Sequence, residues 1–161
     1  VQELSLAVEP RQNNMPSSHI ASYFHLVFST KDRMRFIDPE WEPRLHSYLG
    51  GIVKGIDAVP LQIGGVEDHV HLLVSLKSKH RLDYFLRDLK ADSSEWIHKE
   101  ITKRFEWQKG YGAFSVSPTA TEAVRQYIKR QRQHHTKIDF KTEYIDLLKK
   151  ANLDYEEEYL W

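Results

Sequence analysis

Two histidines separated by a single residue are the first group in the sequence that could carry chemistry. His69 and His71 flank Val70 in a run of β-branched and aliphatic residues. Alternate side chains of a strand point to the same side, so both imidazoles would project from one face and Val70 from the other. Two imidazoles at that spacing suit one divalent cation. Surface or hydrogen-bonded histidines are the alternative, because nine histidines in 161 residues readily produce this spacing.

A tyrosine and a glutamine further along the chain are spaced to share one face of a helix. Tyr127 and Gln131 are four residues apart, and His134 and His135 follow one turn later. A phenol has a pKa of about 10, so it attacks phosphorus well only when a base removes its proton or a metal activates the phosphate. A nearby cation would therefore make Tyr127 a nucleophile. The alternative is a tyrosine that packs against its helical neighbours with its hydroxyl in water.

The lack of cysteine limits the possible metal ligands, and basic residues are candidates for DNA binding. The sequence contains no cysteine, so any metal must be held by histidine, carboxylate or amide ligands. His25 shares a strand face with Tyr23 and Val27, and we expect it to be buried or to support a ligand rather than to bind metal itself. The basic residues that we assign to DNA binding are Lys31, Arg33, Arg35, Lys90 and Arg130. Each of these cations could equally be a solvated surface residue.

The elements that position these residues follow from hydrophobic periodicity and turn signals. β-rich runs predict strands at residues 20–29, 60–66, 69–76 and 113–117, the middle two joined by Glu67-Asp68. Helical periodicity predicts helices from Asp38-Pro39 to about residue 54, over 82–105 and over about 121–135. This order predicts an α+β, ferredoxin-like (split β-α-β) antiparallel sheet. Helices pack on one of its faces, and an additional C-terminal helix carries the tyrosine.

Length and composition predict one globular domain with short flanking segments. At 161 residues with 40% hydrophobic residues, the chain can bury one core. We expect a flexible lead-in at 1–18, a catalytic domain at 19–138 and an acidic tail at 139–161 that packs on the body or on a partner subunit. Met15 is a further candidate for the native start. No apolar run approaches the roughly 20 residues of a membrane span, so we expect a cytoplasmic protein.

The charge balance alone does not indicate a nucleic-acid partner. The chain has 23 basic and 23 acidic residues, whereas nucleic-acid binders usually carry a basic excess. The balance hides an asymmetry, because the tail at 139–161 holds seven acids and three bases. The remainder is therefore basic by four charges, which is compatible with DNA binding without demonstrating it.

Four segments taken in order resemble the single-tyrosine HUH transposases of the insertion-sequence 200/605 group, which include the REP-associated tyrosine transposases. They are HLVFSTK at 25–31, IGGVEDHVH at 63–71, WQKGYGAFSV at 107–116 and the Tyr127-x-x-x-Gln131 pair. The resemblance covers roughly residues 16–161. Four motifs at matching spacing are far more specific than any one alone.

The resemblance implies a fold, a site and a reaction. It implies that the HUH strand binds Mg2+ or Mn2+ through His69 and His71, with Gln131 as third ligand. It also implies that Tyr127 attacks single-stranded, hairpin-bearing DNA, forms a 5'-phosphotyrosine link and leaves a free 3'-hydroxyl. Enzymes of this group work as homodimers in which the tyrosine helix of one subunit can serve the histidine pair of the other.

Two other functions remain open from the residues themselves. A non-catalytic nucleic-acid-binding module can use the same fold, but it needs exposed aromatic residues on the sheet, and the strand of His69 and His71 offers none there. A zinc hydrolase could use these two histidines with His134 or His135 and a metal-bound water. Such an enzyme would turn over without becoming attached to DNA.

Overall fold

The computed structural model describes residues 18–160. Met15 and all but the last residue of the lead-in expected at 1–18 lie outside the described residues. Within residues 18–160, no helix is both long enough and apolar enough to cross a bilayer.

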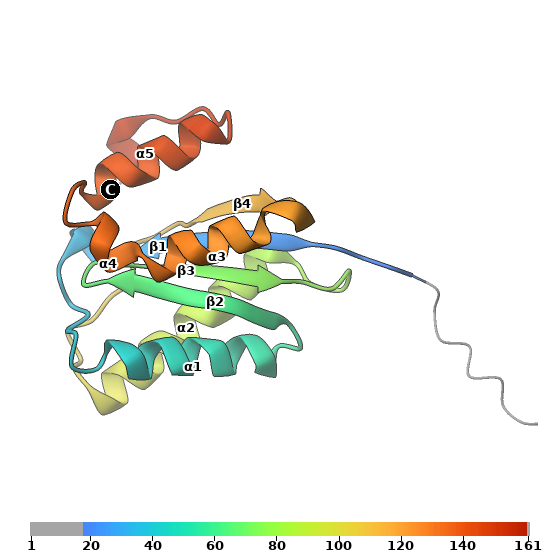
Figure 1. Cartoon of the computed structure of the whole chain (residues 1–161). Helices are drawn as coiled ribbons and strands as arrows, with labels where there is room; N and C mark the ends of the chain where they lie inside the picture. The colour runs from blue at the N-terminus through green and yellow to red at the C-terminus, as the bar shows by residue number, and fades with distance from the viewer. Residues whose placement is uncertain (1–17, 161) are drawn as a thin grey trace, which may run out of the picture.

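A four-stranded antiparallel sheet lies at the centre of the chain (Figure 1). Its strands are β1 (Tyr23–Ser29), β2 (Val59–Val66), β3 (His69–Ser75) and β4 (Gly112–Val116), in the spatial order β2-β3-β1-β4. Each neighbouring pair is antiparallel. With α1 between β1 and β2 and α2 between β3 and β4, this is the split β-α-β order, and the predicted ferredoxin-like fold is confirmed.

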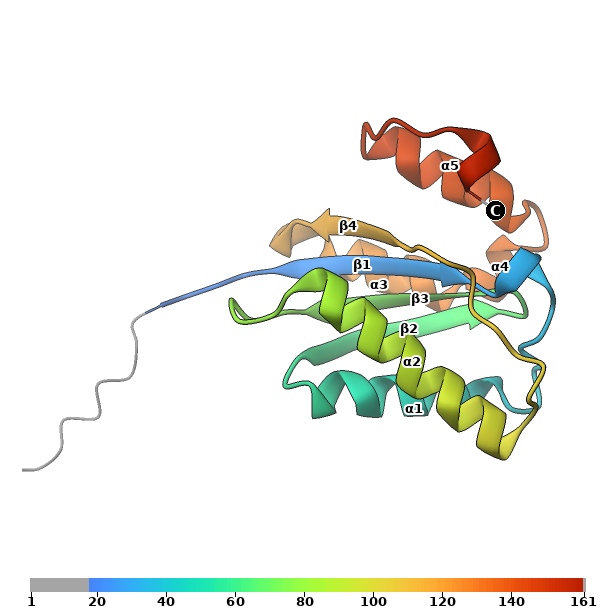
Figure 2. The ribbon, with the colours of Figure 1, turned by 180° about the vertical axis from the view of Figure 1, so that it is seen from behind.

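Two helices cover one face of this sheet and enclose the core. They are α1 (Glu42–Gly55) and α2 (Leu82–Glu100); in Figure 2, α2 crosses in front of the strands and α1 lies below them. The strand residues that point toward them are large and apolar, and those of β3 are Val70, Leu72 and Val74. Because strand side chains alternate, the residues between them, His69 and His71, face the opposite side of the sheet.

The helices that follow β4 lie on this opposite side. A short 3-10 turn, η2 (Pro118–Ala120), leads into α3 (Thr121–Lys129), which packs on β2 and β3. The chain continues through α4 (Gln131–His134) to α5 (Phe140–Lys150), which lies along the β4 side of the sheet (Figure 1). The remaining 3-10 helices are η1 (Lys31–Arg33) and η3 (Glu157–Tyr159).

A glycine allows α3 to approach β2 closely. A Cβ atom added at Gly64 would lie 2.6 Å from the backbone oxygen of Ile128 on α3, well inside van der Waals contact. Gly64 pairs with His71 across the β2–β3 ladder. The absence of a side chain at this position therefore brings the tyrosine helix against the strand of the histidines.

The helix boundaries differ from the prediction at three places. α1 begins at Glu42 rather than at Asp38-Pro39, because the Asp38 carboxylate accepts a hydrogen bond from the Glu40 backbone N–H at 2.8 Å and residues 39–41 form a turn. α2 ends at Glu100, and Phe105 reaches the core from an irregular segment. The helix expected over 121–135 breaks at Arg130, which separates α3 from α4.

Candidate metal and tyrosine site

The two histidines of β3 are completely buried beneath α3 and α5. His69 and His71 each expose 0% of their surface, and their ring centroids are 5.0 Å apart. Full burial is unusual for a titratable side chain and requires that its polar atoms have partners. The structure supplies these partners on the Nδ1 side of both rings.

The Nδ1 contacts leave both Nε2 atoms directed at the same space. The Asp68 carboxylate lies 2.6 Å from Nδ1 of His69, and Nε2 of His25 lies 2.8 Å from Nδ1 of His71. A histidine whose Nδ1 carries the proton presents a lone pair at Nε2, which is the form that binds metal. Nε2 of His71 is buried and makes no hydrogen bond. The structure thus places His25, as expected, in a supporting position behind the pair.

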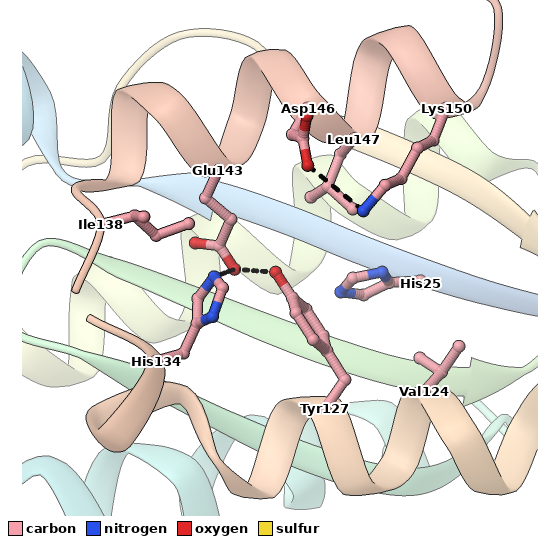
Figure 3. A pocket seen from close by; sticks show the side chains of 9 residues that line it. All are labelled: His25, Val124, Tyr127, His134, Ile138, Glu143, Asp146, Leu147 and Lys150. Carbon is pink, nitrogen blue, oxygen red and sulfur yellow. Dashed lines mark hydrogen bonds and ion pairs between the residues drawn. The ribbon is translucent and has the colours of Figure 1, made fainter. Parts of the chain in front are cut away.

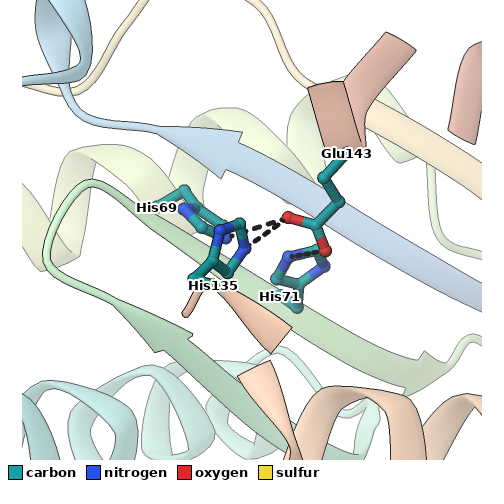
Figure 4. Close-up of side chains that lie close together, drawn as sticks. All are labelled: His69, His71, His135 and Glu143. Carbon is teal, nitrogen blue, oxygen red and sulfur yellow. Dashed lines mark hydrogen bonds and ion pairs between the residues drawn. The ribbon is translucent and has the colours of Figure 1, made fainter. Parts of the chain in front are cut away.

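A carboxylate from α5 faces these two nitrogen atoms (Figure 4). The two oxygens of Glu143 lie 3.3 Å from Nε2 of His69 and 3.3 Å from Nε2 of His71. Its Oε2 also lies 2.6 Å from Nε2 of His135. One donor atom from each of these four residues falls within 4.8 Å of the others, so the cluster is compact enough to hold one metal ion.

Gln131 joins the same cluster from the start of α4. Its Oε1 lies 3.1 Å from Nε2 of His69 and 3.1 Å from Nε2 of His135, and its amide nitrogen donates to Glu143 at 2.8 Å. The side chain is 1% exposed. The amide oxygen of Gln131 therefore faces the imidazoles, and its N–H group faces the carboxylate.

The hydroxyl of Tyr127 reaches the same carboxylate from α3 (Figure 3). It donates a hydrogen bond to Oε1 of Glu143. The phenol ring meets the rings of His25 and His71 edge-on at centroid distances of 5.9 Å and 5.8 Å. Because the chain breaks at Arg130, Tyr127 and Gln131 belong to separate helices, yet both side chains converge on Glu143. All of these groups come from one chain.

A cavity of about 200 Å³ opens beside the phenol. Its lining includes Tyr127, His25, His134 and Glu143. Nε2 of His134 is buried without a hydrogen bond and lies 3.8 Å from Oε1 of Glu143. His134 therefore lines the tyrosine side of the site, whereas His135 belongs to the cluster of His69, His71 and Glu143 that could hold a metal ion.

The electrostatics of the cluster favour a positive charge between the imidazoles and the carboxylate. Burial by itself lowers the pKa of His69, but the carboxylates of Asp68 and Glu143 outweigh it and raise that pKa to about 9. Burial opposes ionisation of Glu143, but the hydrogen bond from His135 and the nearby imidazoles of His69 and His71 hold its pKa well below the usual range. Glu143 is therefore an anion that attracts a cation into its surroundings.

His25, His71 and Tyr127 stay neutral near pH 7. Burial is the largest cause that lowers the pKa of His25 to about 3 and that of His71 to about 4. Burial and then the Glu143 charge raise the pKa of Tyr127 above its ordinary value of 10.0. A neutral phenol beside a carboxylate is a poor nucleophile, so a nucleophilic role for Tyr127 would require a cation that counters the Glu143 charge or activates the phosphate.

The residues present fit a divalent cation. Ligands at right angles around an ion, each about 2.1 Å from it, are separated by about 3 Å. The separations of His69 Nε2 from Gln131 Oε1 and from Glu143 Oε2 are 3.1 Å and 3.3 Å. Imidazole, amide and carboxylate donors together suit Mn2+ or another first-row metal and also accept Mg2+.

The predicted DNA-binding residues lie in different surroundings. Lys31 pairs with Glu106 at 2.6 Å on the surface, and the Lys90 ammonium donates to the carbonyls of Gln108 and Gly110 at 2.5 Å and 2.8 Å. Arg35 lines a polar cavity of about 470 Å³ next to Asp68 and His135. Arg33 lies in η1, and Arg130 is exposed at the break between α3 and α4.

Glu143 is the residue that sequence reasoning misses, because the composition of residues 139–161 predicts only an acidic tail that packs on the body or on a partner subunit. A local signal was available. Asp139 caps α5 by accepting from the Thr142 N–H at 2.9 Å, and Phe140, Glu143 and Leu147 are spaced to share one helical face. A carboxylate on the apolar face of a capped helix indicates a buried acid with a specific partner.

Comparisons with known proteins place this fold among transposases. Residues 18–131, most of the chain and every sheet strand, match the family described as "Transposase IS200 like". The chain therefore belongs to the IS200-like transposase family, as the sequence motifs indicated. No curated protein matches the chain.

Two solved structures share the fold at low sequence identity. One is a protein of Deinococcus radiodurans R1 whose name assigns it to the transposases, with a TM-score of 0.58, 22% identity and coverage of 70% of this chain and 93% of that one. The other is a REP-associated tyrosine transposase bound to a REP hairpin, with a TM-score of 0.58, 12% identity and coverage of 89% of this chain and 88% of that one. At these identities the two structures support the fold alone.

Proposed function

We propose that this transposase cuts and rejoins single-stranded DNA through a covalent tyrosine intermediate that depends on a divalent metal. The observation that carries the proposal is the convergence of the Tyr127 hydroxyl, the imidazoles of His69 and His71 and the amide of Gln131 on one buried point. A nucleophile and three metal-binding side chains come from a strand and two helices. Packing alone does not require them to meet.

In the proposed reaction the Tyr127 oxygen attacks the phosphorus of a phosphodiester. The phenol loses its proton as the 5'-phosphotyrosine bond forms, the bond from phosphorus to the 3'-oxygen breaks, and the 3'-oxygen takes up a proton and leaves as a hydroxyl. The covalent link conserves the phosphodiester energy, so a later 3'-hydroxyl can reverse the step without a nucleotide cofactor. The protein positions the half-buried phenol for attack on the phosphate.

His69, His71 and Gln131 would hold the metal, which we propose to be Mg2+ or Mn2+. When bound, such an ion supplies a positive charge that polarises the phosphate and offsets charge in the transition state. Asp68 and His25 fix the two imidazole rings, as the partners of metal-binding histidines commonly do. The imidazole donors favour Mn2+ over Mg2+, which prefers oxygen ligands and retains several waters.

The substrate class follows from the family and from one structural neighbour. A REP-associated tyrosine transposase has been solved with a REP hairpin, and we propose that this chain also recognises a hairpin in single-stranded DNA. The predicted phosphate contacts are Lys31, Arg33, Arg35, Lys90 and Arg130. A homodimer and a cytoplasmic location remain proposals that rest on the family resemblance.

A zinc hydrolase is the one alternative that a specific observation favours. Three imidazoles, from His69, His71 and His135, share the cluster with a carboxylate, which is also a donor set for a metal-activated water. The two functions differ in whether the protein becomes attached to its substrate. A hydrolase releases both products, whereas the proposed transposase retains one strand on Tyr127.

The test is a cleavage reaction with an end-labelled, hairpin-bearing single strand in the presence of Mn2+, analysed on a denaturing protein gel. We expect a labelled band at the mass of the protein plus DNA, lost by at least about 1,000-fold in Tyr127→Phe. Tyr84→Phe, at an exposed position on α2, serves as the matched control. Cleavage without any adduct would support the hydrolase, and an adduct retained in Tyr127→Phe would exclude this nucleophile.

A further inference from the structure

We infer that α5 is part of the metal site: Glu143 is a carboxylate ligand of the same ion and holds the Tyr127 hydroxyl beside it. The inference rests on the metal site of the proposed function and extends it to a helix that follows the segment matched by the family. Residues 139–161 are then more than an acidic tail, because they supply one charged ligand of the metal.

The surroundings of Glu143 are those of a ligand. The residue is 2% exposed, and in the described part of the chain its ion pairs are with histidines alone: His69, His71, His134 and His135. Burying a carboxylate costs several kcal/mol unless a cation compensates it. Three of these histidines carry their donor atoms in the metal-binding cluster, so a divalent ion there would neutralise the carboxylate directly.

The geometry places the carboxylate on the metal-binding side of both imidazoles. Its oxygens are 3.3 Å from both Nε2 atoms, and Nε2 of His71 is buried without a hydrogen bond. These separations are close to the roughly 3 Å expected between neighbouring ligands of one ion.

Contacts of α5 other than those of Glu143 also join it to the sheet. Phe140 stacks on the His69 ring at a centroid distance of 4.2 Å, and Gly112 of β4 leaves room for the ring of Tyr144. The next acid on the helix, Asp146, is exposed and pairs with Lys150 at 3.2 Å. Helix α5 thus presents one buried and one solvated carboxylate, which supplies a matched pair for the test.

Glu143 also connects the nucleophile to the ion. Its Oε1 accepts the hydrogen bonds of the Tyr127 hydroxyl and of the Gln131 amide while it faces His71. A metal bound to this carboxylate would therefore have the phenol oxygen next to one of its ligands. Glu143→Gln keeps the shape and an acceptor oxygen but removes the charge.

The test is direct measurement of Mn2+ binding to the metal-free full chain, by the paramagnetic resonance signal of free Mn2+, without DNA. We expect Glu143→Gln to weaken the affinity at least about tenfold and Glu143→Asp to weaken it less, whereas Asp146→Asn stays within about twofold. Thermal melting with chelator present verifies that each variant is folded. The rise in melting temperature on adding Mn2+ should be smaller in Glu143→Gln than in the unchanged chain.

His69→Ala distinguishes failure of the ligand role of Glu143 from failure of the proposed metal site itself. If His69→Ala loses Mn2+ binding while Glu143→Gln binds as well as the unchanged chain or better, Glu143 is no ligand, although the proposed metal site stands. If His69→Ala also binds Mn2+ normally, the proposed metal site itself is wrong. Should Glu143→Gln fail to fold, the Glu143→Asp affinity decides, and an unchanged value overturns the inference.

Discussion

The hydroxyl of Tyr127 on α3 donates a hydrogen bond to the carboxylate of Glu143 on α5. The same carboxylate faces the imidazoles of His69 and His71, so one anionic group joins the predicted nucleophile to the predicted metal ligands. Burial and the Glu143 charge raise the pKa of Tyr127, and a cation bound at the imidazoles would counter that charge.

Replacing His25, which contacts His71 but is not a proposed metal ligand, should lower the affinity of the site for metal. His25→Leu removes the hydrogen-bond partner of the His71 Nδ1, so the ring loses its fixed orientation and tautomer. We expect Mn2+ affinity to fall about 10- to 100-fold, and His25→Gln, which keeps an acceptor, to recover part of the loss. Isothermal titration calorimetry measures both, and equal affinities for all three proteins would contradict the supporting role.

Adding one methyl group between β2 and α3 should displace the tyrosine helix. In Gly64→Ala the new Cβ would lie 2.6 Å from the Ile128 backbone oxygen, so α3 must shift or the chain is strained. We expect a loss of about 1–3 kcal/mol in the free energy of unfolding together with reduced adduct formation.

Gly50→Ala is the matched control. At this position on α1 the nearest atom, Cδ1 of Ile63, is 3.6 Å away, and alanine also favours a helix. Stability should be unchanged or rise by up to about 1 kcal/mol in urea unfolding. A Gly64→Ala protein that is as stable and as active as Gly50→Ala would show that the close approach of α3 is unimportant.

Acid should destabilise the fold through a histidine outside the site. Burial, and then the positive charge of Arg132, lower the pKa of His46 from 6.5 to about 4. The unfolded chain therefore takes up a proton first, so this contribution to stability is complete above pH 6.5 and is lost as the pH falls toward 4. The loss amounts to up to about 3 kcal/mol at 1.36 kcal/mol per pKa unit.

His46→Gln isolates this effect, because the other buried histidines titrate alike in both proteins. The free energy of unfolding in urea, measured from pH 7.5 to pH 4, should fall less steeply in His46→Gln than in the unchanged chain. Parallel curves would show that His46 is protonated with equal ease in the folded and unfolded states.

Phosphate contacts should appear as a change in the salt dependence of DNA binding. Arg35 lines the polar cavity next to Asp68 and His135, so Arg35→Ala should weaken binding of a single strand and reduce the slope of log affinity against log salt by about 0.7. Arg87→Ala, on α2 at the opposite face and paired with Asp88, is the control. Fluorescence anisotropy measures both slopes, and the same slope for the two variants would remove Arg35 from the interface.

The fold and the histidine pair could be predicted because local signals determine them. Strand periodicity places His69 and His71 on one face whatever covers that face, and the order of strands and helices limits the topology to few choices. Helix ends were predicted less well. Nothing in the periodicity shows that Phe105 packs from a non-helical segment or that the backbone breaks at Arg130, because tertiary packing decides both.

Glu143 could not be assigned in the same way, because its partners lie far away in the sequence. Its carboxylate meets His71 from 72 residues further along the chain, and the acidic composition around it conceals one buried acid among several exposed ones. The four-residue spacing of Tyr127 and Gln131 predicts a continuous helix and does not reveal the break at Arg130 between them. Both side chains still meet because Glu143 lies between them.

The most direct test of the whole account is a crystal structure of the full chain soaked with Mn2+, with data collected at the manganese absorption edge. The account predicts a single strong anomalous peak within about 2.3 Å of Nε2 of both His69 and His71 and next to the Tyr127 hydroxyl. A peak elsewhere, or no peak at a Mn2+ concentration that supports cleavage, would contradict the claim that these residues share one metal ion.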